Sequence, residues 1–258
     1  MTPEWRRCEL EERGHIEFIQ EQEMEWTSHE YSDEVPAVER KNLSTDARTG
    51  AFTDLVWLHE GWELDGPRSF PHTQELFVLE GEVTVDSHDL DERCYVRLPE
   101  DVKFDGIRAR SDARVLWMSE GDLAGEGEEG HFIWEEPEDS VYVQDAKEME
   151  WTEASIELQI KTLWTDEENG AHIHLLYADE GWEEPRSEHH PMVEESYKLS
   201  GDMLLGEPGI MRGGGYFWRP PWIHHGPLRS VEGTTSLIRG DQEHITYWTD
   251  EDGNPIDW

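Results

Sequence analysis

Apolar residues in this chain fall into short runs, many of them alternating with polar residues, and the runs end at Gly, Pro or Asp. Alternation with a period of two, bounded by turn residues, is typical of β-strands. The clearest runs are 52–58, 75–85, 113–118, 171–177, 195–205 and 234–239. Helical periodicity is limited to one turn expected near residues 4–13. Many short strands at regular spacing predict an all-β sandwich or barrel.

The two halves of the chain resemble each other. The matching segments are 41–46 with 161–166, 61–63 with 181–183, and 23–27 with 148–152. A period near 120 residues, as between 41 and 161, is too long for a solenoid repeat and suits a duplicated domain. We therefore expect two domains, 1–125 and 126–258, connected through the segment 121–139, which is rich in Gly and Glu.

The composition indicates a folded protein that stays in the cytoplasm. Of 258 residues, 35% are hydrophobic and 13 are Trp, which argues against intrinsic disorder. No apolar stretch is long enough for a membrane span, and the N-terminus lacks the apolar core of a signal peptide. Cys8 and Cys94 are the only cysteines, too few for a disulfide framework or a thiolate zinc site.

The charge is strongly negative and evenly distributed. The chain has 61 Asp and Glu against 21 Lys and Arg, for a net charge of −40, and only five of the basic residues are Lys. Such a surface repels itself in dilute salt, and concentrated salt screens the repulsion. We therefore expect a halophilic protein from a salt-rich cytoplasm; an ordinary acidic protein is the alternative. Either origin argues against nucleic acid as a partner, because phosphate contacts need clustered cations.

Two segments of the second half carry a recognisable spacing. In 189–201 two histidines precede a carboxylate and a glycine, and in 215–227 Pro220 and His225 lie five residues apart. These segments resemble the two sequence motifs of the cupin superfamily, and residues 74–81 resemble a degenerate first motif in the first half. The resemblance covers both halves and implies a bicupin, an all-β protein of two tandem cupin jelly-roll β-barrels.

By this resemblance His190, Glu194 and His225 occupy the positions of metal ligands. Two imidazoles and a carboxylate suit one divalent transition metal such as Fe, Mn, Ni or Zn. The family usually has a further His two residues before His190, where this chain has Glu188. Either Glu188 is the fourth ligand, which the alternation of strand faces favours, or His189 takes its place through a shifted loop.

Other polar residues of the second half are candidates for catalysis. His172 and His174 share one face of their strand and either line the barrel, where one could bind metal or substrate, or face water. Lys198 follows Glu194 by four residues on the same face. Inside a barrel its ammonium needs a carboxylate partner or a depressed pKa, which would suit acid–base work; alternatively its stem lies inside and its ammonium reaches the rim. The catalytic candidates are therefore Glu188, Lys198 and His174.

The first half has lost the metal set. His72 aligns with the first metal-binding histidine, but Gln74, Phe104 and Phe70 replace the other three positions. A single His without partners is more often packed than metal-bound. We expect the first barrel to be structural or to serve as a dimerisation half, which would give a homodimer.

Cupins with such a metal set include dioxygenases that act on small diketones, aromatic or thiol compounds, and also isomerases and lyases. The resemblance therefore implies a metal-dependent, dioxygenase-like enzyme that acts on a small oxygenated organic substrate in the second barrel. The alternatives are a metal-dependent isomerase or lyase, and a non-catalytic bicupin that binds or senses a small ligand. We expect His224 to point outward and Trp222 to wall a substrate pocket.

Overall fold

A computed structural model of the chain describes residues 13–125, 140–155, 157–250 and 256. Apart from Arg13, the helical turn expected at 4–13 lies outside this range. Across the described residues the structure is almost entirely β, as expected, and its one helical element is the short 3-10 helix η1 (Glu21–Glu23). None of the helices in the described part is long and apolar enough to cross a membrane.

The chain folds into two compact units, an N-terminal unit of Met24–Met149 and a C-terminal unit of Met1–Glu23 with Glu150–Trp258. This division differs from the expected domains, 1–125 and 126–258, in two ways. The first 23 residues belong to the unit formed by the second half. The segment up to residue 149 belongs to the unit formed by the first half.

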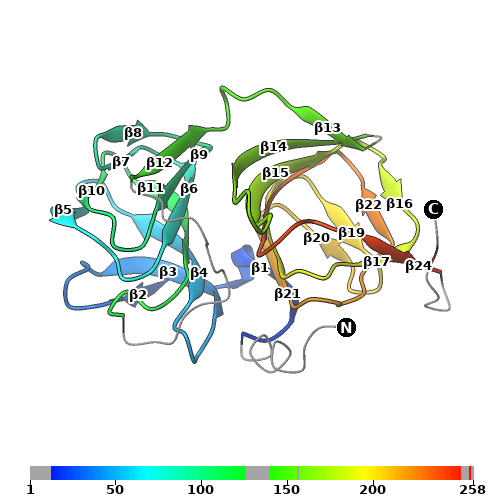
Figure 1. Cartoon of the computed structure of the whole chain (residues 1–258), viewed down its shortest axis with the longest axis horizontal. Coiled ribbons are helices and arrows are strands. Elements are labelled where there is room, and N and C mark those ends of the chain that lie inside the picture. Colours follow the sequence, from blue (N-terminus) through cyan, green and yellow to red (C-terminus); the bar gives the residue numbers. More distant parts are fainter. Residues whose placement is uncertain (1–12, 126–139, 156, 251–255, 257–258) are drawn as a thin grey trace. The chain divides into compact units, whose positions relative to one another are not determined.

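The N-terminal unit contains eleven of the strands labelled in Figure 1. They are β2 (Thr27–His29), β3 (Val38–Thr45), β4 (Phe52–Leu58), β5 (Glu63–Arg68), β6 (Gln74–Glu80), β7 (Val83–Val85), β8 (His88–Leu90), β9 (Cys94–Leu98), β10 (Phe104–Ala109), β11 (Ala113–Ser119) and β12 (Tyr142–Asp145). The larger sheet has the order β12-β9-β6-β11-β4-β3-β2, and the smaller one β5-β10-β7-β8. Apolar side chains from both sheets form one core, in which Leu76, Val85 and Trp117 are fully buried.

The C-terminal unit has the same architecture. Its strands are β1 (Ile16–Gln20), β13 (Thr152–Ser155), β14 (Leu158–Thr165), β15 (His172–Ala178), β16 (Glu183–Glu184), β17 (Ser187–His189), β18 (Glu194–Ser200), β19 (Met203–Leu205), β20 (Ile210–Met211), β21 (Gly215–Arg219), β22 (Leu228–Ser230), β23 (Thr234–Gly240) and β24 (Tyr247–Thr249). The larger sheet has the order β1-β21-β18-β23-β15-β14-β13 and the smaller one β16-β22-β19-β20; β17 pairs with β24. Each unit is therefore a pair of antiparallel sheets of the jelly-roll type.

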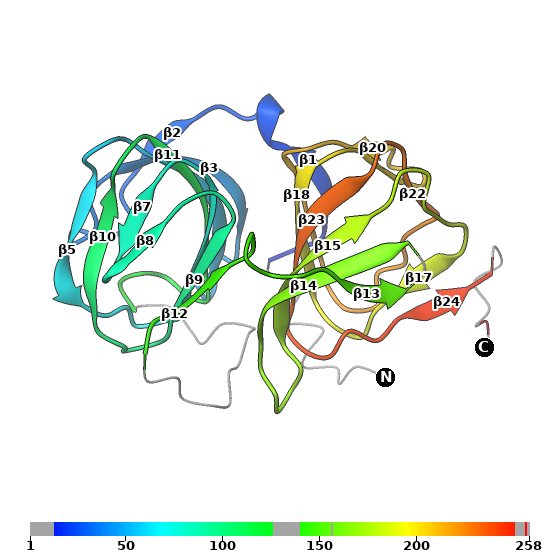
Figure 2. The same ribbon diagram turned by 90° about the horizontal axis from the view of Figure 1, so that it is seen from above.

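In each larger sheet one of the two edge strands comes from outside that unit's own copy of the repeat. It comes from the segment just before the other copy. In the C-terminal unit β1 pairs antiparallel with β21, and Figure 2 shows it in blue beside strands from the end of the chain. In the N-terminal unit β12, which precedes the second copy, pairs with β9 in the equivalent position. The two copies thus exchange their leading strands.

The strands lie where the alternation predicted them, with one difference. The runs 75–85 and 195–205 were each expected to form a single strand, but each is a pair, β6 with β7 and β18 with β19. The break falls at Gly81 and Gly201, which have φ of 83° and 73°. A Cβ atom at these positions would lie 2.2 Å and 2.0 Å from a backbone carbonyl oxygen, so only glycine fits the turn.

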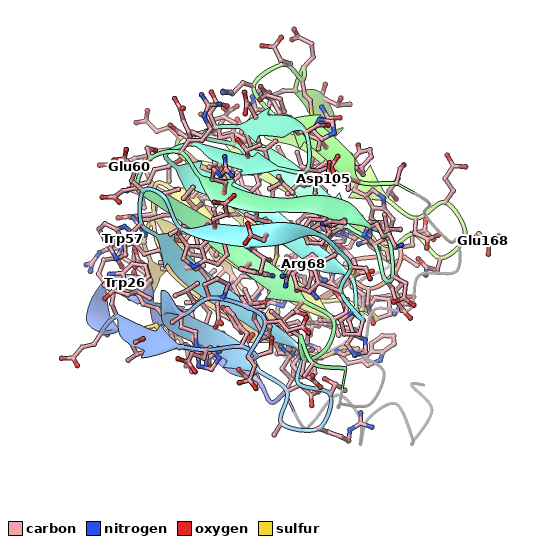
Figure 3. The ribbon with its side chains drawn as sticks, turned by 90° about the vertical axis from the view of Figure 1, so that its left-hand side faces the viewer. Trp26, Trp57, Glu60, Arg68, Asp105 and Glu168 are labelled. Carbon is pink, nitrogen blue, oxygen red and sulfur yellow. The ribbon has the colours of Figure 1, made fainter. Side chains whose placement is uncertain are left out.

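Packing details repeat along with the topology. In the N-terminal unit the ring of Trp26 meets Trp57 edge-on at 5.4 Å between centroids, next to each other in Figure 3, and the Nζ of Lys41 lies 4.8 Å from the Trp26 ring. The corresponding residues of the C-terminal unit are Trp151, Tyr177 and Lys161. This correspondence supports a duplication of one ancestral domain.

A buried ionic network also occurs in both units. In the C-terminal unit Glu195 accepts a hydrogen bond of 2.7 Å from the Tyr216 hydroxyl and lies 3.2 Å from Nη1 of Arg239 and 3.6 Å from Nη2 of Arg13. In the N-terminal unit Glu75 and Tyr95 take the places of Glu195 and Tyr216, but the arginine is Arg97 of β9, at the position of Trp218. Because Glu195 alternates with Glu194 along β18, this network lies on the face of the sheet away from the barrel interior.

Candidate metal centre

The backbone brings the predicted metal-binding segments together. Glu188 in β17 forms an antiparallel bridge with His225: each backbone N–H donates to the other residue's carbonyl, at 2.8 Å and 2.9 Å. His190 follows β17, and Glu194 opens β18. Two segments more than thirty residues apart in the chain are thus fixed against each other at the open end of the barrel.

The side chains of Glu188, His190 and His225 converge. The Oε1 atom of Glu188 lies 3.3 Å from Nε2 of His225 and 4.0 Å from Nε2 of His190. One ligand atom from each residue lies within 4.8 Å of the others, a spacing that a single ion could bridge. The Oε2 atom of Glu194 is 3.8 Å from Nε2 of His225, so the fourth predicted residue borders the same space. Both imidazoles and Glu194 are buried.

Hydrogen bonds to the backbone fix how both imidazoles face this space. The Nδ1 of His190 is 3.1 Å from the Ile245 carbonyl, and the Nδ1 of His225 is 3.2 Å from the Ile223 carbonyl. A carbonyl only accepts, so each Nδ1 donates its proton to it, and in the neutral form of the ring the lone pair of Nε2 faces the carboxylates. Lone pairs facing carboxylate oxygens repel one another unless a cation lies between them, so the donor set fits a divalent metal.

Glu194 has a second partner that the sequence analysis missed. Arg219 lies opposite it in the register of β18 and β21, is only 2% exposed, and places Nη1 3.2 Å from Oε2 of Glu194. Burial favours the neutral form of this carboxyl group, but the charges of His225, His190 and Arg219 favour the ionised form more strongly and lower the pKa of Glu194 to about 2. The carboxylate is therefore ionised throughout the neutral range.

His172 and His174 lie inside the barrel rather than facing water. His172 of β15 and Glu194 of β18 are both register partners of Gly240 in β23, so they lie on the same inner face. The rings of His172 and His174 stack at 5.0 Å between centroids. A third imidazole, from His244 in the loop after β23, lies 5.9 Å and 6.4 Å from these rings; no sequence signal marked it.

Desolvation lowers the pKa of all three imidazoles. It lowers the pKa of His172, and it lowers the pKa of His174 well below its ordinary value, with a further contribution from the charges of His172 and His244. His244 is exposed as a residue, but its ring packs against the rings of His172, His174 and His190, and this partial desolvation and then the charge of His190 lower its pKa to about 4. All three are therefore neutral at neutral pH.

Lys198 differs from the expectation that its ammonium would reach the barrel rim. The residue is only 3% exposed, and Nζ donates a 2.6 Å hydrogen bond to Oγ of Ser236, its register partner in β23. The side chain stays inside because it projects from the middle of β18, where a hydroxyl on the neighbouring strand is within its reach. Burial lowers the pKa of Lys198 to about 7, although the charge of Glu194 opposes the shift.

The structure places Glu188, and not His189, with the other predicted ligands. The His189 ring turns away, stacks on Tyr247 at 5.6 Å and packs against His224 at 4.3 Å with the two rings tilted by 40°. Trp222, expected to wall the pocket, packs on the outer side of this group, 5.7 Å from the ring of His189. These rings form an aromatic layer outside the candidate centre.

In the N-terminal unit apolar rings occupy the corresponding space. Phe70 and Phe104, at the positions of Glu188 and His225, stack at 5.3 Å between centroids. Gln74 accepts a 2.9 Å hydrogen bond from Nε1 of Trp117. Within the described part of this unit the one group of possible metal ligands is Asp91, Cys94 and Asp145, which lies at the start of β9, with Lys147 beside both aspartates.

A family model for a domain of unknown function, DUF4437, matches residues 17–246 of the chain. The chain belongs to the DUF4437 family. The match spans both copies of the repeat, so the family domain is the duplicated pair. None of the curated proteins matches this DUF4437 chain in sequence.

Several solved structures share its fold. A candidate dioxygenase from Nostoc punctiforme is 20% identical with a TM-score of 0.75, over 90% of this chain and 84% of that one. A variant of Bacillus subtilis oxalate decarboxylase is 11% identical with a TM-score of 0.58, over 89% and 78%. A cupin 2 barrel protein from Leptotrichia buccalis is 13% identical with a TM-score of 0.53, over 81% and 90%. These likenesses support the cupin-type jelly-roll fold predicted from the sequence.

Proposed function

We propose that the C-terminal unit is a metal-dependent cupin enzyme, dioxygenase-like, that acts on a small oxygenated organic substrate. The observation that carries the proposal is the pair of Nε2 atoms of His190 and His225, both turned toward the carboxylates of Glu188 and Glu194 in a buried space. These four residues would hold one divalent transition metal. When bound, such a metal supplies Lewis acidity and open positions for oxygen ligands.

The residues around the centre would bind and orient an oxygen-rich substrate. Arg219 and Lys198 project into the barrel from β21 and β18, and both are buried, so their N–H groups are directed at the interior instead of at water. Phe217 lies under the Arg219 guanidinium, with 3.9 Å between that group and the ring centroid, and holds it in place. A buried site lined by such donors strengthens their electrostatic attraction for carbonyl or carboxylate oxygens.

One observation favours a second candidate, a metal-dependent isomerase or lyase. The pKa of Lys198 is lowered to about 7, so its Nζ can both take up and release a proton at neutral pH. In such an enzyme Lys198 would hold or move that proton, and the carboxylate of Glu188 could serve as a second base. The two candidates share the metal centre and differ in whether dioxygen is consumed.

The test is metal analysis and oxygen uptake on the purified full chain in concentrated KCl. We expect His225→Ala to lose one equivalent of metal per chain, and His224→Ala, its outward-facing neighbour, to lose none. Oxygen uptake with a panel of small diketones, phenols and carboxylates should depend on the metal and disappear in His225→Ala. Equal metal content in His225→Ala and wild type would refute the centre; turnover of a panel compound without oxygen uptake would favour the isomerase or lyase.

A further inference from the structure

The imidazoles of His172, His174 and His244 form a second cluster inside the C-terminal unit that shares no residue with the candidate metal centre. We propose that this trio is a separate binding site for a divalent transition metal, held by nitrogen atoms alone. The proposal goes beyond the proposed function, since neither the fold nor the cupin motifs assign a role to these three residues.

The geometry of the trio suits a single ion. One ring nitrogen from each residue lies within 4.8 Å of the others. The rings of His172 and His174 are close to parallel, at 16°, because the two residues are neighbours on the inner face of β15. His244 completes the set from a different element, the loop between β23 and β24, with its ring 23° from that of His172. The site is therefore built from a strand, which fixes His172 and His174, and a loop, which carries His244.

The buried Nε2 atom of His172 indicates that the site binds a ligand from outside the chain. The Nδ1 of His172 lies 2.9 Å from the carbonyl of Gly170, so Nδ1 carries the proton and Nε2 is an acceptor. His172 is only 8% exposed, and its Nε2 makes no hydrogen bond of normal geometry among the described residues, the backbone of Gln242 being the other polar group beside the ring. Leaving a buried polar atom unpaired is unfavourable, and a metal ion would remove that cost.

The surrounding chain leaves room for the trio. Gly240 lies opposite His172 in β23, and a Cβ atom there would be 2.7 Å from Cε1 of His172 and 2.9 Å from the sulfur of Met192. Glycine therefore allows the imidazole to occupy the space between the two strands. His174 is buried behind His172, while His244 is exposed, which gives an ion a path from solvent.

The two sites would prefer different metals. The ring of His190 in the first site lies 4.6 Å from that of His244, edge to face, so the sites are neighbours. The first has two carboxylates and is the harder, oxygen-rich set, whereas the trio offers only imidazole nitrogen, which suits Zn, Cu, Ni or Co better than Mn. One chain could thus bind two ions of different kinds side by side.

The experiment is a titration of the metal-free full chain with Co(II) in concentrated KCl, reading bound cobalt by equilibrium dialysis and its environment by visible absorption. We expect two Co(II) per wild-type chain, one in His244→Ala and one in His225→Ala, with different absorption spectra in the two variants. His224→Ala is the matched control and should bind two. His244 is exposed, so its replacement should leave the near-ultraviolet circular dichroism unchanged.

The outcomes separate this inference from the proposed function. One Co(II) in the wild type that His244→Ala retains and His225→Ala loses would overturn the trio and leave the proposed centre intact. One Co(II) with the reverse dependence would support the trio and overturn the proposed centre. One Co(II) lost in both variants would mean a single shared site and would overturn the trio as a separate site, and none in the wild type would overturn both proposals.

Discussion

Replacing the buried Lys198 should stabilise the C-terminal unit in a way that depends on pH. Its ammonium is enclosed in the barrel with a single neutral partner, the Oγ of Ser236 at 2.6 Å. Methionine has a similar length and no charge, so Lys198→Met keeps the packing and removes the buried cation. The effect should be largest at low pH, where the folded wild type must carry the charge in an apolar space.

The sign and size of the change in unfolding free energy follow from proton linkage. Burial lowers the pKa of Lys198 from 10.5 to about 7. Between these two values the unfolded chain binds a proton that the folded chain does not, so wild-type stability rises with pH across this window and the penalty is complete below it. At about 1.4 kcal/mol per pH unit the full penalty is on the order of 5 kcal/mol, about 4 at pH 7 and about 2 at pH 9.

The substitution also removes a hydrogen bond. Ser236 loses its partner, which costs about 1 kcal/mol at every pH. We therefore expect Lys198→Met to be more stable than wild type by about 3 kcal/mol at pH 7 and by about 1 kcal/mol at pH 9, with the gain gone at about pH 10. The difference between pH values, rather than the value at any one pH, tests the reasoning.

The assay is urea unfolding at a series of pH values in concentrated KCl, followed by hydrogen exchange of peptides that cover β18 and β23. These peptides report on the C-terminal unit alone. Lys161→Met is the matched control, because that lysine is only half-buried and its ammonium lies over the Trp151 ring, 4.8 Å from its centroid. A Lys198→Met effect that is the same at pH 7 and pH 10 would refute a buried ammonium with a depressed pKa. With five lysines in the chain, the side-chain pKa can also be read by carbon-13 NMR of labelled lysine.

Two further predictions concern stability. Dilution from concentrated salt into low ionic strength should unfold or loosen the chain, because −40 charges are no longer screened; far-ultraviolet circular dichroism that is unchanged after desalting would contradict the salt-adapted surface. Glu195→Gln should cost the C-terminal unit about 3–5 kcal/mol in urea unfolding, since it removes the carboxylate charge that lies 3.2 Å from the buried Arg239 guanidinium. Glu75→Gln should do the same to the N-terminal unit, and a cost below about 1 kcal/mol in either variant would be the pattern of an exposed ion pair.

Sequence alone could predict the strands and the convergence of the candidate ligands because both depend on local spacing. Alternation fixes which residues of β18 face inward, so Glu194 and Lys198 could be placed on one face, and the same rule favours Glu188 over His189. Arg219 carried the same signal, two residues after Phe217 on the inner face of its strand, and was overlooked. These residues lie in regular strands, where the position of a residue along the strand determines the face of the sheet to which its side chain points.

The other features of the fold and the site depend on long-range geometry, which local sequence patterns do not encode. His244 lies in a loop, and its approach to His172 depends on where β23 ends and how the chain returns to β24. The edge position of β1 is equally hidden, because an alternating strand can pair with any open sheet edge. The burial of the Lys198 ammonium also required the register that places Ser236 opposite it.

The divergence of the two units follows from how each fills the same space between its sheets. In the N-terminal unit the stacked rings of Phe70 and Phe104 exclude water and contribute packing energy without any ligand. In the C-terminal unit Glu188 and His225 fill it with polar groups whose desolvation is unfavourable unless a cation joins them. The same fold therefore has two kinds of interior: an apolar one that is stable without a ligand, and a polar one whose cost in stability a bound cation would offset.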